Sequence, residues 1–222
     1  VMGLAALMAA SCTKSNTAVV DAHIEGADNK LVMVAQLSVN QMKLVDTVRT
    51  DSKGTFKSEF AVSEETPNFY YIAYNGRRLA SLVLKNGDKV KVTADTLGKN
   101  VTIEGSEESA LIAEFCHDYF ASADALADIA ENKLSTLSNN PMLERQAYNY
   151  AREAMLVQLR FVGAHQDCLA AIYALHHSVA EQYIPQLDGE GVSIVHYRSV
   201  LEGIKTKYPN SPYIAVLERN IA

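Results

Sequence analysis

The hydrophobic pattern of this 222-residue chain changes its period once, and that change limits the folds open to it. Up to Gly105 apolar residues recur at every second position, as in 88–94, whereas from Ser106 onward they recur at every third or fourth position. Alternation is typical of strands with one buried face, and the longer period is typical of amphipathic helices. The sequence therefore predicts an α+β protein of separate units, a β domain at 18–105 followed by an all-α domain at 106–222.

The apolar segments of the β domain are short and are separated by turn residues. Gly, Asn, Asp and Lys cluster at 26–29, 51–54, 75–76, 86–88 and 98–100. Asn-Gly pairs in particular suit turns that need positive φ. Many short strands at this spacing predict an antiparallel β-sandwich or a small barrel of about seven to eight strands.

The second unit is expected to contain five helices. Ser106 can cap the first helix, and Glu107 and Glu108 are interpreted as solvated acids that complement its dipole. Pro141 suits the first turn of the second helix. We expect the other three helices around 169–176, at 194–205 and from 212 to the last residue, with a loop at 185–189.

The first residues are expected to belong to a signal peptide, inside which the sequence begins. Residues 1–11 are uncharged, apolar or small, and lead directly to Cys12. Small residues before a cysteine resemble a lipobox, whose cysteine becomes the acylated N-terminus. The 1–12 segment and a polar tether at 13–17 then predict a lipid-anchored, periplasm-facing protein of the bacterial cell envelope. The alternative is an apolar helix packed on the protein, with Cys12 an ordinary thiol.

The charge of the chain argues against nucleic acid as a partner. Its net charge is -6 at pH 7, whereas nucleic-acid-binding domains carry a basic face. The apolar stretch at the beginning is too short to span a bilayer. Membrane attachment is therefore expected through the lipid on Cys12 and not through a spanning helix.

Two further cysteines, Cys116 and Cys168, lie in different predicted helices. They either form a disulfide between packed helices, as a periplasmic protein can, or are buried thiols that act as small hydrophobic residues. Their separation excludes a Cys-x-x-Cys redox pair. The sequence thus predicts no redox dithiol in this region.

No pattern in the sequence indicates a catalytic centre, a cofactor or a metal. The six histidines lack the spacing of a His-Glu-x-x-His zinc site, and no Gly-x-Ser-x-Gly elbow, phosphate loop or dinucleotide fingerprint occurs. His176 and His177 are adjacent, so they should point to different sides of a helix. We therefore expect no catalytic, cofactor-binding or metal-binding residues here.

The aromatic run at 68–74 has two interpretations. Alternation places Phe69 and Tyr71 on one face of the strand and Tyr70 and Tyr74 on the other. These side chains either pack in the core or line a ligand groove. The first interpretation is favoured, because aromatic residues are common in strands that pack on a core.

Several strand and turn patterns resemble a known family. They lie at 24–26, 45–48, 51–56, 82–92 and 101–106, with a further motif at 208–212 in the helical unit. The chain resembles the N-terminal region, a domain of unknown function, of bacterial envelope lipoproteins that end in a TlpA/ResA-like thioredoxin domain. The resemblance implies that such a domain, with a Cys-x-x-Cys pair, follows position 222.

The leading hypothesis is therefore a non-catalytic accessory region of an envelope thiol–disulfide oxidoreductase. Its partners would be the membrane, through the anchor, and a protein or peptide. The alternative is a stand-alone envelope lipoprotein that binds a peptide, a glycan or a protein. A downstream Cys-x-x-Cys would favour the first hypothesis.

Overall fold

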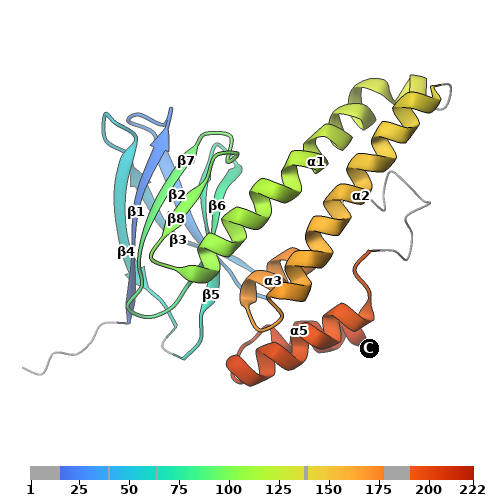
Figure 1. Cartoon of the computed structure of the whole chain (residues 1–222). Coiled ribbons are helices and arrows are strands. Elements are labelled where there is room, and N and C mark those ends of the chain that lie inside the picture. Colours follow the sequence, from blue (N-terminus) through green and yellow to red (C-terminus); the bar gives the residue numbers. More distant parts are fainter. Residues whose placement is uncertain (1–15, 40, 64, 138–139, 178–190) are drawn as a thin grey trace, which may run out of the picture.

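The computed structural model describes residues 16–39, 41–63, 65–137, 140–177 and 191–222, and at 130–137 it describes the backbone alone. The predicted signal segment with Cys12, most of the tether at 13–17 and the predicted loop at 185–189 lie outside these residues. Strands occupy the first half of the chain and helices the second, and the two units lie side by side (Figure 1).

The strands in the described part of the chain form two four-stranded sheets that pack as a sandwich. They are β1 (Thr17–Glu25), β2 (Leu31–Leu37), β3 (Met42–Arg49), β4 (Thr55–Ala61), β5 (Asn68–Tyr74), β6 (Arg77–Leu84), β7 (Lys89–Asp95) and β8 (Thr102–Glu104). One sheet has the order β4-β1-β7-β8 and the other β3-β2-β5-β6. The predicted sandwich is confirmed, and the alternative of a closed barrel is not what forms.

Strand β7 illustrates how the alternating pattern builds the sandwich. Val90, Val92 and Ala94 are buried, and the residues between them are exposed. Successive side chains of a strand point to opposite faces, so one face of this sheet enters the core and the other meets solvent. Tyr70 and Ile72 of β5 enter the same core from the opposite sheet.

One strand pair departs from the expected antiparallel arrangement. β1 and β7 are parallel, with Val20 opposite Val90 and Ala22 opposite Val92. The other pairs within the described residues are antiparallel. Alternation of polar and apolar residues is the same for either direction, so the sequence pattern carried no information about this pair.

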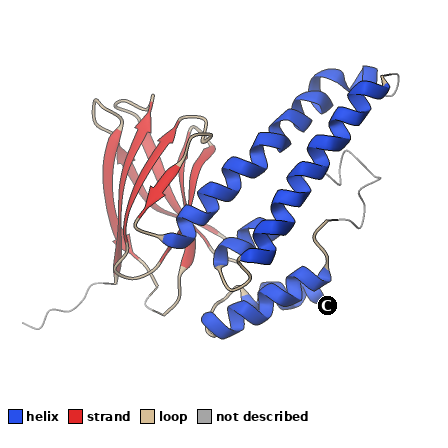
Figure 2. Ribbon diagram, in the orientation of Figure 1, coloured by secondary structure: helices blue, strands red, loops and turns tan. Residues whose placement is uncertain are grey.

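The β5–β6 hairpin has the turn that its sequence predicts, and it is buried on both faces. Asn75 and Gly76 connect the strands with φ of 49° and 75°, as a type I′ turn requires. Tyr70 faces the sandwich core, whereas Phe69 and Val83 face a second core that contains helical residues. This sheet therefore has helices on its outer side (Figure 2).

The helices lie at the predicted positions. In the described residues they are α1 (Glu107–Leu137), α2 (Pro141–Ala164), α3 (Leu169–Leu175), α5 (Ile194–Lys207) and α6 (Ile214–Ile221). α1 and α2 form a long hairpin that extends away from the sandwich, and α3 and α5 lie nearer to its base (Figure 1). Asn140 caps α2 by accepting the N–H of Leu143, and Pro141 occupies the first turn.

Two serines at the start of α1 attach the helical unit to the edge strand β6. The Ser109 hydroxyl accepts the N–H of Val83 at 2.8 Å, and the Ser106 hydroxyl donates to the Val83 carbonyl at 2.8 Å. An edge strand otherwise presents such backbone groups unpaired. Ser106 also accepts the N–H of Ser109 at 3.3 Å, which confirms the predicted helix cap.

The interpretation of Glu108 as a solvated acid is wrong. Glu107 is exposed, but Glu108 is buried and its carboxylate accepts the N–H of Leu169 at 2.6 Å and the hydroxyl of Tyr208 at 2.5 Å. The Lys207 ammonium lies 3.6 Å from the same carboxylate. A buried carboxylate needs such partners, and here they tie α1 to α3 and to the end of α5.

Candidate functional site

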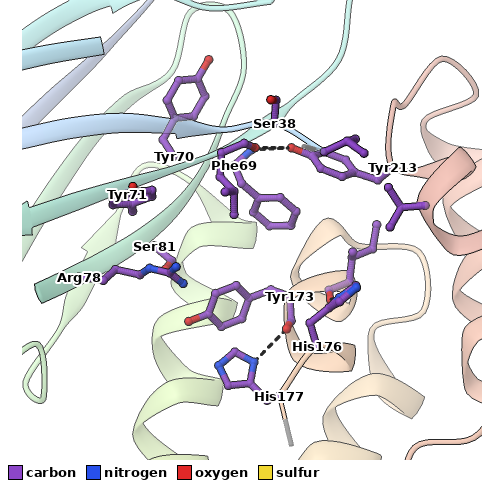
Figure 3. A pocket seen from close by; sticks show the side chains of 14 residues that line it. Ser38, Phe69, Tyr70, Tyr71, Arg78, Ser81, Tyr173, His176, His177 and Tyr213 are labelled. Carbon is purple, nitrogen blue, oxygen red and sulfur yellow. Dashed lines mark hydrogen bonds between the residues drawn. The ribbon is translucent and has the colours of Figure 1, made fainter. Parts of the chain in front are cut away.

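A cleft of about 430 Å³ lies between the outer face of β5 and β6 and the residues around α3 and α6 (Figure 3). Small-molecule sites have volumes of about 300–1,000 Å³, so the cleft is large enough for a small ligand. Its walls are mainly aromatic and aliphatic, with one arginine and two histidines. The polar and aromatic side chains considered below are Phe69, Tyr71, Arg78, Ser81, Tyr173 and His177.

A β-bulge determines which residues of β6 reach the cleft. The pairing shifts between Ile72 and Ala73 of β5, which lie opposite Ala80 and Arg78, so that Leu79 is the extra residue. Simple alternation would direct Arg78 and Ser81 to opposite faces. Because a bulge re-aims the side chains beyond it, both residues line the cleft.

Tyr173 on α3 forms the helical wall opposite these strands. Its hydroxyl lies 3.4 Å from the Cys116 thiol of α1 and also interacts with the Ser81 hydroxyl. Desolvation, together with the neighbouring thiol, raises the pKa of Tyr173 to about 12. Tyr173 is therefore a neutral hydroxyl at physiological pH and can donate a hydrogen bond.

Arg78 supplies the permanent charge of the cleft. Its guanidinium carbon lies 5.2 Å from the centre of the Tyr71 ring, a cation–π distance. Among the described residues, none that lines the cleft is an Asp or a Glu, and no carboxylate lies within 4.0 Å of Arg78. The cleft thus has a positive charge that no acid among its described residues neutralises.

His177 lies in an aromatic enclosure directly after α3. Its ring centre is 4.6 to 5.8 Å from the ring centres of Phe115, Tyr119, Phe120 and Tyr173. Its Nδ1 lies 3.0 Å from the Tyr173 carbonyl, so this nitrogen is the N–H donor. Desolvation lowers the pKa of His177, and the imidazole is therefore neutral at pH 7.

Tyr213, just before α6, closes the end of the cleft against the sandwich. Its hydroxyl donates to the carbonyl of Leu37 at 3.0 Å and accepts the N–H of Phe69 at 3.3 Å. These two residues face each other across β2 and β5. Leu217 of the same C-terminal segment is fully buried in the second core. The C-terminal segment is thus held against both strands.

A second cavity, of about 320 Å³, adjoins the first. Both cavities are lined by Arg78, Ser81, Tyr173 and His177, and the second extends past Cys116 toward α1. These four side chains therefore separate two hollows along one seam between the sandwich and the helices. The favoured interpretation of the aromatic run, packing alone, is incomplete, because Phe69 and Tyr71 also line the cleft.

The two cysteines of the helical unit are free thiols with different neighbours. Cys116 contacts Tyr173 as described, whereas Cys168 lies 3.5 Å from the Lys207 ammonium. Burial raises the pKa of Cys116, and burial together with Glu108 raises that of Cys168 to about 11. Both thiols are therefore protonated near pH 7 and are weak nucleophiles.

These groups are arranged for binding more than for bond cleavage. Within the described residues, no cluster of three or more His, Cys, Asp and Glu side chains could hold a metal ion. No helix in the described part is both long and apolar enough to cross a membrane. The seam offers neutral hydroxyl donors, a cation and aromatic walls, which can hold and orient a ligand.

The sandwich and the first turns of α1 are the part of the chain that a known family matches. Residues 18–112 match DUF4369, a domain of unknown function. The DUF4369 match includes the strand side of the cleft but stops before α3 and α6. The cleft is therefore built only in part by the matched domain.

Other comparisons add little. No curated protein matches the chain. One solved structure that matches is a 9R-lipoxygenase from Cyanothece PCC8801, with 12% identity and a TM-score of 0.24. The match covers 58% of this chain and 25% of that one. A score this low does not establish a common fold, so we draw nothing from this match.

Proposed function

We propose that this chain is the non-catalytic accessory region of a bacterial cell-envelope thiol–disulfide oxidoreductase, held on the membrane through Cys12. In this proposal the cleft between the sandwich and the helices holds a ligand or a segment of a partner. The redox chemistry would belong to a thioredoxin-like domain elsewhere in the same protein. This region would position what that domain acts on.

The observation that carries the proposal is the contrast between the cleft and the thiols. The cleft is open, aromatic and charged, as a recognition site is. Cys116 and Cys168 have separate neighbours and raised pKa values, and thiol exchange needs the thiolate. Recognition without redox catalysis is therefore what the described residues support best.

The match of residues 18–112 to a domain of unknown function covers the strand region on which the resemblance is based. It agrees with the resemblance of the strand and turn patterns to the N-terminal region of envelope lipoproteins. The anchor on Cys12 and the thioredoxin-like partner domain rest on that resemblance and on the small residues before Cys12.

A stand-alone binding lipoprotein is the second candidate. The observation in its favour is that strands and helices of this chain suffice to form the walls of the cleft. Such a protein would take a peptide, a glycan or a protein partner without any redox domain.

The full-length gene product tests the choice between these candidates. We expect it to reduce insulin disulfides through a Cys-x-x-Cys pair downstream of position 222, while residues 16–222 alone show no turnover. A full-length protein without such a pair and without activity would favour the second candidate. Turnover by 16–222 that disappears in Cys116→Ser or Cys168→Ser would contradict both.

The anchor is tested separately by growing cells with a labelled fatty acid. We expect label in the natural protein and none in Cys12→Ser. Equal label in the two proteins would remove the lipid anchor from the proposal.

A further inference from the structure

We propose that the cleft binds an apolar or aromatic molecule that carries a single carboxylate, and that Arg78 binds this carboxylate. The inference rests on the proposed function, because it identifies the chemical class of ligand that the cleft holds.

The position of Arg78 carries the first step. Its guanidinium carbon lies 5.2 Å from the centre of the Tyr71 ring, and among the described residues no carboxylate lies within 4.0 Å of it. The N–H donors of a guanidinium lie in one plane and form a fork. A carboxylate can accept two of these donors side by side, which is a favourable geometry for this pair.

The surroundings of Arg78 make an acidic ligand the complementary one. The described residues that line the cleft include no Asp or Glu. Asp124 lies in the wall of an adjoining cavity that Arg78 also lines, but it is paired with Lys99 at 2.6 Å. The hydroxyl of Tyr173, which also contacts Cys116 and Ser81, is a neutral group on the same side of the cleft as Arg78 (Figure 3). An acidic group of the ligand would therefore meet the guanidinium and, among the described residues of the wall, no acidic side chain.

The number of charges favours a carboxylate over a phosphate dianion. Among the described residues that line the cleft, Arg78 is the permanent cation, and His176 and His177 are the other basic residues. His177 is enclosed by aromatic rings and is neutral at pH 7. One guanidinium balances the single charge of a carboxylate, whereas a phosphate dianion would keep one negative charge without a partner.

The rest of the cleft indicates an apolar body for the ligand. Phe69, Ile172 and Val216 line it beyond Arg78, and the volume is about 430 Å³. Aromatic and aliphatic walls favour a ligand that buries apolar surface. We therefore infer an amphipathic monocarboxylate and not a sugar or a free amino acid.

Two probes that differ only in charge test the inference: 2-naphthylacetate and its uncharged amide, 2-naphthylacetamide. The chain contains no Trp, so naphthalene fluorescence can be followed without an indole background. Titrating residues 16–222 and measuring anisotropy, we expect saturable binding of the acid, at least about tenfold tighter than that of the amide.

Arg78→Gln and Arg77→Gln form the matched pair of variants. Both residues are exposed and both changes remove one positive charge, but Arg77 does not line this cleft. We expect Arg78→Gln to weaken binding of the acid by about tenfold or more and to leave the amide unchanged. Arg77→Gln should change neither by more than about twofold. Circular dichroism of each variant checks that the fold is kept.

Three results would overturn the inference. They are equal affinity for acid and amide, equal loss in both arginine variants, and no saturable binding of either probe. None of them decides the proposed function, which depends on the redox assay of the full-length protein. If that assay fails while the acid binds through Arg78, the cleft belongs to a stand-alone binding protein.

Discussion

The two sheets of the sandwich have the same number of strands but different surroundings. In β1 and β7 of the first sheet, buried and exposed residues alternate, and one face meets solvent. In β5 and β6 of the second sheet, most residues are buried on both faces. The first sheet therefore contributes to one core, whereas the second lies between the sandwich core and the helical core.

This difference explains where the cleft forms. A sheet with one wet face has a polar outer surface, such as the lysines of β7. The outer face of β5 and β6 has aromatic and aliphatic side chains that helices cover only in part. Where the helices do not cover this face, an apolar cleft remains. Arg78 lines the cleft because the β-bulge in β6 turns its side chain toward this face.

Neighbouring residues of β6 give the strongest test of the two cores. Leu82 points into the sandwich core and Val83 into the helical core, and both are buried. We expect Leu82→Ala to lower the free energy of unfolding by about 2–5 kcal/mol. Val83→Ala, which removes less apolar volume, should lower it by about 1–3 kcal/mol. Urea unfolding followed by circular dichroism measures both.

Lys91→Ala serves as the control, because Lys91 lies on the solvent face of β7. A surface change of this kind is expected to stay within about 0.5 kcal/mol of the natural protein. If Val83→Ala behaved like Lys91→Ala, the helices would not pack on the second sheet, and the comparison of the two sheets would fail.

The sequence predicted the strands, the turns and the positions of the helices because these depend on local periodicity and on turn residues. Asn75 and Gly76, for example, require a tight hairpin whatever surrounds them. The parallel pairing of β1 and β7 could not be predicted, because it depends on which sheet β7 joins after β6. Strand direction leaves no trace in the alternation of residues.

The candidate site was harder to predict than the strands and helices, because it depends on a β-bulge and on contacts between distant segments. One signal was available: the run at 79–84 is apolar apart from Ser81, and such a run indicates a strand buried on both faces. Arg78 could not be assigned to the cleft, because its orientation depends on a bulge that no residue pattern marks. Tyr173 and Tyr213 reach the cleft only through tertiary packing of helices distant in the sequence.

The helical unit also contains a buried carboxylate, that of Glu108, which accepts hydrogen bonds from two other segments. Replacing it by Gln keeps the shape but leaves weaker partners for Leu169 and Tyr208. We expect Glu108→Gln to lower the free energy of unfolding by about 1–3 kcal/mol. The neighbouring change Glu107→Gln, at an exposed position, should cost less than about 0.5 kcal/mol. Equal effects in urea unfolding would mean that Glu108 is solvated in solution.

The smallest expected effect is on the pH dependence of stability. We expect His177 in the helical core to contribute to the loss of stability at acid pH. Desolvation among aromatic rings lowers the pKa of His177 below the ordinary histidine value of about 6.5. As pH falls through 6.5, the unfolded chain takes up this proton before the folded chain does, so the folded state loses stability. Between pH 7 and pH 5 the free energy of unfolding should therefore fall less in His177→Gln than in the natural protein. If the two proteins lose the same stability over this range in urea unfolding, His177 is hydrated. In that case water reaches the aromatic rings around His177 at the end of α3.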